Sequence, residues 1–355
     1  MSTPPDGSAS SAPSAPESPA ASAPAKRSAR KAVRFIVIAM VLINIGAFAP
    51  AFILGALGLK DAIFVAMLAG LSSFLACFMG SGWKTGLHVS VPFAVFCALT
   101  VWAAPYALAA ALVLGAAAFW RGYGARLGLH NALMMSVISL GFIVTQPPKF
   151  EGSSFSAPLL TGLVALAASL YVTLVMFIGR RWVHPPALTK LVTARVLAYS
   201  SILAVMIGVV TWFVIHFKLG QGGAWIILTI LVVFQPYLGT SYKKAGQRII
   251  GTGLGFVLAF IIGQFVSGGA LMYVLSVVLF VVANCCMLLG KPYWVFVLFL
   301  TPAVVLMTSA GSTVDDTAVL RVEATVVGVA ITLVVMLVLT PLAKHLQAKS
   351  GAPKY

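Results

Sequence analysis

The chain has 355 residues, of which 61% are hydrophobic and only 8% are charged, and its formal net charge is +16. A soluble domain carries roughly 25% charged residues, so this composition excludes an ordinary soluble protein. Apolar stretches recur along the chain without strand-like alternation, which predicts membrane-spanning α-helices rather than a β-barrel. The excess of Lys and Arg then indicates basic cytoplasmic loops next to lipid, and we expect no nucleic-acid partner.

Residues 1–30 are rich in Ser, Ala and Pro and predict a disordered cytoplasmic tail. The hydropathy that follows predicts an all-α polytopic membrane protein with about twelve transmembrane helices. In chain order these are residues 35–57, 62–80, 86–102, 104–120, 131–147, 157–179, 196–216, 224–240, 248–266, 270–289, 293–310 and 317–340. They predict a first six-helix half at 31–182, a cytoplasmic linker at 183–195, a second six-helix half at 196–343 and a cytoplasmic tail at 344–355.

Loop charges predict the orientation of these helices. The connections that would lie outside hold few cations, namely Lys60, Lys149 and Lys218, whereas those that would lie inside hold most of the Lys and Arg. This alternation follows the positive-inside rule. It predicts a multi-pass protein of the bacterial inner membrane with both termini in the cytoplasm.

An internal repeat relates the two halves when the chain is shifted by about 162 residues, mainly through hydropathy and loop lengths. Gly58 then aligns with Gly220, and Gly128 aligns with Gly290 at a basic cytoplasmic turn. Because each half has an even number of predicted spans, the halves would be parallel repeats about an axis along the membrane normal, as in many transporters. A duplicated scaffold without a transport role is the alternative.

Two ionisable residues fall within the last predicted span, where a charge is costly and therefore informative. Arg321 shares a helical stripe with Thr325 and Gly328, which is typical of a cavity-lining or a helix-packing face. If the face lines a cavity, Arg321 and Thr325 are the candidates to bind substrate. Glu323 lies about 200° around the helix from Arg321 and is the only acid in the predicted spans, so it is the candidate proton carrier. The alternative is that Arg321 and Glu323 both reach towards the membrane interface.

A second candidate region surrounds Pro236, which removes a helix donor and should kink or end the eighth span. Broken helices within a membrane usually line protein or a water-filled cavity, where Gln235 and Tyr237 would present polar atoms to substrate. A simple kink in a packed helix is the alternative.

Three cations follow this region at the predicted cytoplasmic mouth: Lys243, Lys244 and Arg248. They would concentrate and bind organic anions, although such clusters often only set topology. The sequence contains no phosphate-binding loop, hydrolase motif or metal-ligand spacing, so we predict no enzyme activity, catalytic residue, metal or cofactor.

The second half resembles the FUSC family, the fusaric acid resistance and aromatic acid exporter group, over about residues 196–340. The resemblance is carried by Trp225, the pair Gln235-Pro236, the run from Gln247-Arg248 to Gly251-Thr252 with Gly255, and Arg321 with Gly328. It implies an inner-membrane exporter of aromatic carboxylic acids or similar weak acids that uses the proton gradient, often with a periplasmic adaptor subunit. Many members of the family carry a large cytoplasmic domain, for which this sequence has no segment.

Two other functions stay open at this point. One is a different twelve-span carrier, such as a major-facilitator-type transporter, and the other is a non-transporting membrane component of an envelope complex. The expected partners are a small organic anion and membrane lipid. The sequence leaves open whether the protein needs an adaptor subunit or forms a homo-oligomer.

Overall fold

The computed structural model describes residues 45–150, 156–181, 188, 190–266, 269–308 and 314–350. The chain divides into two compact units, Met1–Met40 and Val41–Tyr355, and every described residue belongs to the second. The tail predicted for residues 1–30 and the start of the first predicted span lie outside the described residues. Within the described ranges all regular structure is helical and no strand occurs, which confirms the predicted all-α fold class.

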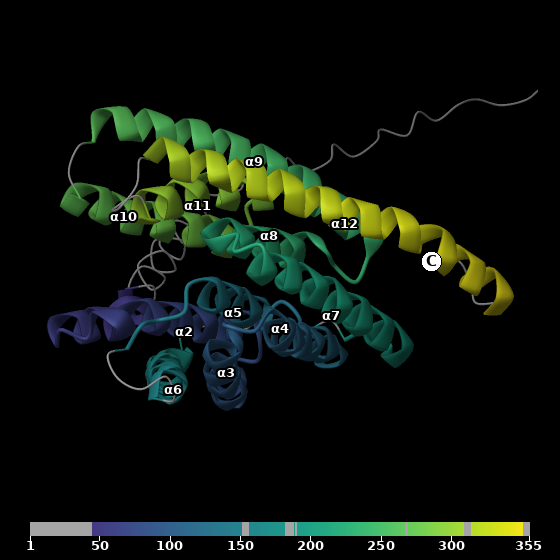
Figure 1. Ribbon diagram of the computed structural model, residues 1–355, viewed down its shortest axis with the longest axis horizontal. Helices are drawn as coiled ribbons and strands as arrows, with labels where there is room; N and C mark the ends of the chain where they lie inside the picture. Colours follow the sequence, from purple (N-terminus) through teal and green to yellow (C-terminus); the bar gives the residue numbers. More distant parts are fainter. Residues whose placement is uncertain are drawn as a thin grey trace, which may run out of the picture. The chain divides into compact units, whose positions relative to one another are not determined.

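The helices follow one another with short connections, and Figure 1 shows them by label. In chain order they are Ile45–Ala56, α2 Lys60–Met79, α3 Trp83–Ala103, α4 Ala107–Tyr123, α5 Met134–Thr145, α6 Ser156–Ile178, α7 Thr193–His216, α8 Gly220–Val233, α9 Leu238–Phe265, α10 Gly269–Leu288, α11 Tyr293–Thr308 and α12 Val314–Ser350. Single 3₁₀ turns follow α4 at Gly124–Leu127 and α6 at Gly179–Arg181.

Among the residues that the structure describes, seven helices are long and apolar enough to cross a membrane, which makes the chain a multi-pass membrane protein. They are Lys60–Met79, Trp83–Ala103, Ala107–Leu127, Ser156–Arg181, Arg195–His216, Gly239–Phe265 and Val319–Val338. The same described ranges hold five shorter apolar helices: Ile45–Ala56, Met134–Thr145, Gly220–Val233, Val274–Met287 and Tyr293–Leu306. Because a spanning helix needs about 20 residues, the division into twelve spans and two parallel halves stays a prediction.

Many of the largest helix contacts join helices that are not neighbours in the sequence. The most extensive contacts join α4 with α7, α3 with α6, and α9 with α11, while α12 lies against both α8 and α9 (Figure 1). At Gly251 and Gly255, α9 approaches α11 closely. A Cβ atom added at Gly255 would lie 2.6 Å from Cβ of Thr301 and 2.9 Å from the carbonyl oxygen of Leu298, both on α11.

Two helix boundaries differ from the prediction. The break at Pro236 is present, but it forms the short connection between α8 and α9, and α9 begins at Leu238 instead of residue 248. The predicted mouth cations therefore lie on the first turns of a helix, because nothing between Leu238 and Arg248 interrupts it. The last helix continues to Ser350 instead of ending at 340, since Ala, Lys, Leu and Gln all favour helix outside the membrane as well.

Candidate functional site

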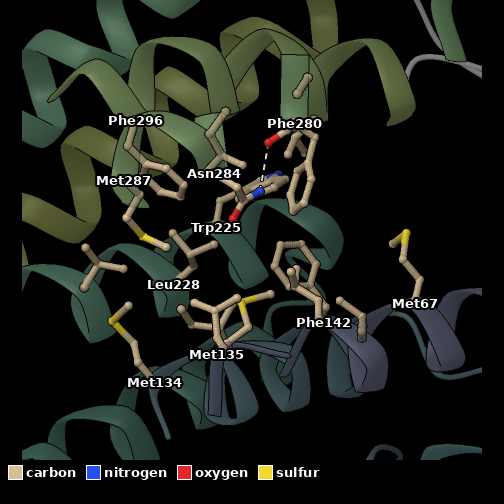
Figure 2. Close-up of a pocket in the computed structure, with 18 of the residues that line it drawn as sticks. Met67, Met134, Met135, Phe142, Trp225, Leu228, Phe280, Asn284, Met287 and Phe296 are labelled. Carbon is tan, nitrogen blue, oxygen red and sulfur yellow. Dashed lines mark hydrogen bonds between the residues drawn. The ribbon is translucent and has the colours of Figure 1, made fainter. Parts of the chain in front are cut away.

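A cavity of about 360 Å³ lies inside the second unit, within the size range of small-molecule sites. Its wall is built from the helix Ile45–Ala56 and from α2, α5, α8, α9, α10, α11 and α12. It therefore lies between elements of both predicted halves, and Figure 2 shows part of its lining.

Eight aromatic residues and five methionines are among the residues that line the cavity. On one side α2 and α5 carry Met67, Met134, Met135 and Phe142, and on the other α10 and α11 carry Phe280, Met287 and Phe296 (Figure 2). Methionine is flexible and polarizable, so this lining can adapt to apolar bodies of different shape and favours contact with aromatic rings. The cavity thus suits a ligand with a largely apolar body.

Arg321 brings a positive charge to this cavity from α12, as the sequence predicts. Its side chain is 1% exposed, and its Nη1 donates a hydrogen bond of 3.5 Å to the carbonyl oxygen of Thr301. Its Cζ lies 4.3 Å from the ring centroid of Trp225, a cation–π contact. Phe142 packs edge-on against the same indole with centroids 4.7 Å apart, so the aromatic platform under Arg321 is held from the first half of the chain.

Arg248 and Lys244 line the same cavity from α9. They are four residues apart and therefore lie on one face of the helix. Arg248 is 1% exposed, and its Nη1 donates a hydrogen bond of 3.2 Å to the hydroxyl oxygen of Tyr293. The Lys244 ammonium lies 6.0 Å from the ring centroid of Tyr293. One tyrosine on α11 therefore contacts both cations.

The buried guanidinium groups have more donors than acceptors around them. The Nε and Nη2 groups of both Arg248 and Arg321 are buried without a hydrogen-bond partner. Among the side chains that the structure describes, the carboxylates are Asp61 and Glu323, and both are exposed. Buried charges are normally paired, but no carboxylate among the described side chains is buried beside these cations.

Several other predicted site residues do not line the cavity. Gln235 is buried, but its side-chain nitrogen donates to the carbonyl oxygen of Val232 at 2.8 Å, so its amide is engaged locally. Tyr237 is exposed, and the Cζ of Arg195 lies 4.9 Å from its ring centroid. The hydroxyl of Thr325 donates to the backbone oxygen of Arg321 at 2.8 Å, so its hydrogen bond is made within α12.

Lys243 and Glu323 also lie outside the cavity lining, with exposed side chains. Arg321 and Glu323 lie on different faces of one helix, as predicted. The Arg321 side chain is 1% exposed, whereas the Glu323 side chain is exposed. Of the predicted site residues, the structure therefore brings three cations together at one cavity: Arg321, Arg248 and Lys244.

A further buried cation near this site was not singled out by the sequence. Arg121, at the end of α4, is fully buried, and its Nε donates to the backbone oxygen of His130 at 3.1 Å. Burial, together with the positive charges of Arg121 and Lys244, lowers the pKa of His130 to about 4. The distribution of Lys and Arg along the sequence did not indicate that Arg121 would be buried, because it predicts on which side of the membrane a residue lies and not how exposed its side chain is.

Residues 203–335 match the family model described as fusaric acid resistance protein-like. The match supports a FUSC family assignment. The FUSC segment runs from within α7 to within α12 and contains Arg248, Arg321 and Trp225, so the predicted resemblance is confirmed. Comparison with curated proteins and with solved structures returned no match.

Proposed function

We propose that the chain is an inner-membrane transporter that exports aromatic carboxylic acids or related weak organic acids, driven by the proton gradient. One observation carries this proposal: Arg321 and Arg248 are buried at an aromatic and methionine-lined cavity with N–H groups that no described protein group accepts. A carboxylate on an aromatic body would satisfy both the charge and the apolar lining. The FUSC match and the multi-pass helical fold agree with a membrane transporter.

Two pairs of turns support the proposed repeat of two parallel halves. Gly58 and Gly220 have φ of 77° and 51°, and Gly128 and Gly290 have φ of 78° and 68°. Members of each pair stand at equivalent positions under the shift of about 162 residues. Both pairs adopt the left-handed backbone region that favours glycine, so the turns recur in conformation as well as in position.

The helix pairing supports the repeat in the same way. In the first half α6 contacts α2 and α3, and in the second half α12 contacts α8 and α9. The opening helix of each half packs on the other half: α7 packs along α4, and Phe48 of the helix Ile45–Ala56 meets Phe280 of α10 with ring centroids 5.3 Å apart. Such reciprocal contacts are expected from a pseudo-two-fold axis through the cavity.

The proposed orientation places both termini in the cytoplasm, where the cluster of Lys243, Lys244 and Arg248 would meet the substrate first. Gln235 and Tyr237, outside the cavity lining, would act at this entrance. A periplasmic adaptor subunit and self-association into a homo-oligomer stay predictions.

Glu323 is the proposed proton carrier because it is the only carboxylate that the sequence places within a span. Its side chain is exposed on the opposite side of α12 from the cavity, so coupling to substrate would pass through movement of the helix rather than through direct contact. This route predicts that loss of Glu323 leaves substrate binding intact.

Transport by the purified protein in proteoliposomes tests the proposal. We expect proton-dependent movement of 2-naphthoate, and we expect Arg321→Ala and Arg248→Ala to reduce it strongly. Arg180→Ala is the matched control, because Arg180 is exposed and outside the cavity lining. Equal transport by all four proteins, or movement of no aromatic acid in a broad panel, would contradict the proposed function.

A further inference from the structure

The two cavity arginines offer the same edge of their guanidinium groups. Each uses Nη1 for a protein acceptor, the Tyr293 hydroxyl for Arg248 and the Thr301 carbonyl for Arg321, and each leaves Nε and Nη2 without a partner. Nε–H and Nη2–H point in parallel from one side of the planar group, and together they bind both oxygens of one carboxylate. Each arginine is therefore an oriented fork for a carboxylate.

One helix orients both guanidinium groups, since the two acceptors, Tyr293 and Thr301, belong to α11. Arg121 differs in both respects. It donates through Nε, leaving Nη1 and Nη2 unpaired, and it does not line the cavity. The shared edge is thus a property of the two cavity arginines rather than of every buried arginine in the described part of the chain.

The first half offers no matching cations. Under the shift of about 162 residues, the positions equivalent to Arg248 and Arg321 are Gly86 and Leu159. The cavity therefore has a cationic side on α9 and α12 and an apolar side on α2 and α5. The guanidinium groups of Arg248 and Arg321 carry like charges at one cavity of about 360 Å³, so they repel each other. A ligand with a single carboxylate leaves one of these two forks unmatched.

We propose that the cavity takes a ligand with two separated carboxylates on an aromatic body, one carboxylate on the Arg321 fork and the other on the Arg248 fork. This inference rests on the proposed function, because it takes the cavity as the substrate site. The aromatic body lies against the methionine and phenylalanine side chains of α2 and α5. The unpaired N–H groups are covered in this structure, so neighbouring side chains move when the carboxylates enter.

Equilibrium binding to the purified full chain in detergent tests this inference with three probes. They are 2-naphthoate, naphthalene-2,6-dicarboxylate with its carboxylates at opposite ends, and naphthalene-1,8-dicarboxylate with the same charge but adjacent carboxylates. We expect the 2,6-isomer to bind about tenfold more tightly than either of the others, because the second fork adds charge-assisted hydrogen bonds. Equal affinities for the 2,6- and 1,8-isomers would show that charge alone acts and would overturn the inference.

Variants of the two arginines test whether each one binds one carboxylate of the ligand. Arg248→Gln and Arg321→Gln should each remove the advantage of the 2,6-isomer while still binding 2-naphthoate through the remaining fork, which also shows that the variant is folded. The matched control Arg180→Gln should keep the full advantage. If 2-naphthoate binds and is transported but the 2,6-isomer has no advantage, the inference fails and the proposed function stands. If no probe binds, both fail.

Discussion

Replacing Arg321 with methionine should make the unliganded protein more stable and at the same time weaken its response to ligand. Methionine is unbranched and flexible like arginine but carries no charge. The change removes two buried unpaired N–H groups, Nε and Nη2, each of which costs about 1–3 kcal/mol. It loses the long hydrogen bond to Thr301 and the cation–π contact with Trp225, together worth roughly 2–3 kcal/mol.

The difference is a net gain of about 2 kcal/mol in the free energy of unfolding without ligand. Thermal unfolding of the purified protein, followed by circular dichroism with and without 2-naphthoate, measures both effects. We expect a higher Tm for Arg321→Met without ligand and a smaller increase when ligand is added. If the variant is less stable than the unaltered protein and gains as much from ligand, Arg321 is a structural residue and the reasoning is refuted.

Three further predictions test the packing and the titration of the protein. Gly255→Ala should destabilise the α9–α11 contact by about 1–3 kcal/mol, because its Cβ meets Thr301 at 2.6 Å. The control Gly253→Ala has nothing within 4 Å and should be neutral or slightly stabilising in an unfolding titration. His130 has a pKa of about 4 instead of the usual 6.5, so the folded protein binds fewer protons than the unfolded chain between pH 4 and pH 6.5. The contribution of neutral His130 to the free energy of unfolding is therefore complete above pH 6.5 and is lost as the pH falls towards 4. His130→Gln should flatten that part of the stability profile, and an unchanged profile would mean that His130 is not buried. Glu323→Gln should abolish substrate-driven proton flux in proteoliposomes and leave 2-naphthoate affinity within about twofold; unchanged flux would show that the proton travels elsewhere.

Helical architecture was predictable from this sequence because hydropathy and length decide it almost alone. The apolar runs needed only the rule that a backbone in lipid satisfies its own polar groups. The boundaries at α9 and α12 were not predictable in the same way. Polar residues at the ends of a span, such as Lys243 and Lys244, are as compatible with a helix that leaves the membrane as with a loop.

The candidate site was predictable in part for a related reason. Arg321 was singled out because a charge in an apolar run needs an explanation, and its stripe of small and polar residues is indeed buried. Tyr293 and Thr301 could not be foreseen, since nothing in their own segment marks them. Their role arises from the crossing of α11 with α9 and α12, and such long-range contacts leave no periodic pattern in one sequence.

The exchange of the opening helices has a consequence for biosynthesis. The face of α4 that will receive α7 is made well before α7 leaves the ribosome, and α10, against which Phe48 packs, comes later still. The first half therefore enters the bilayer with unfilled contacts that only the second half can complete. Two polypeptides divided between α6 and α7 should accordingly be unstable when produced separately and should assemble when produced together.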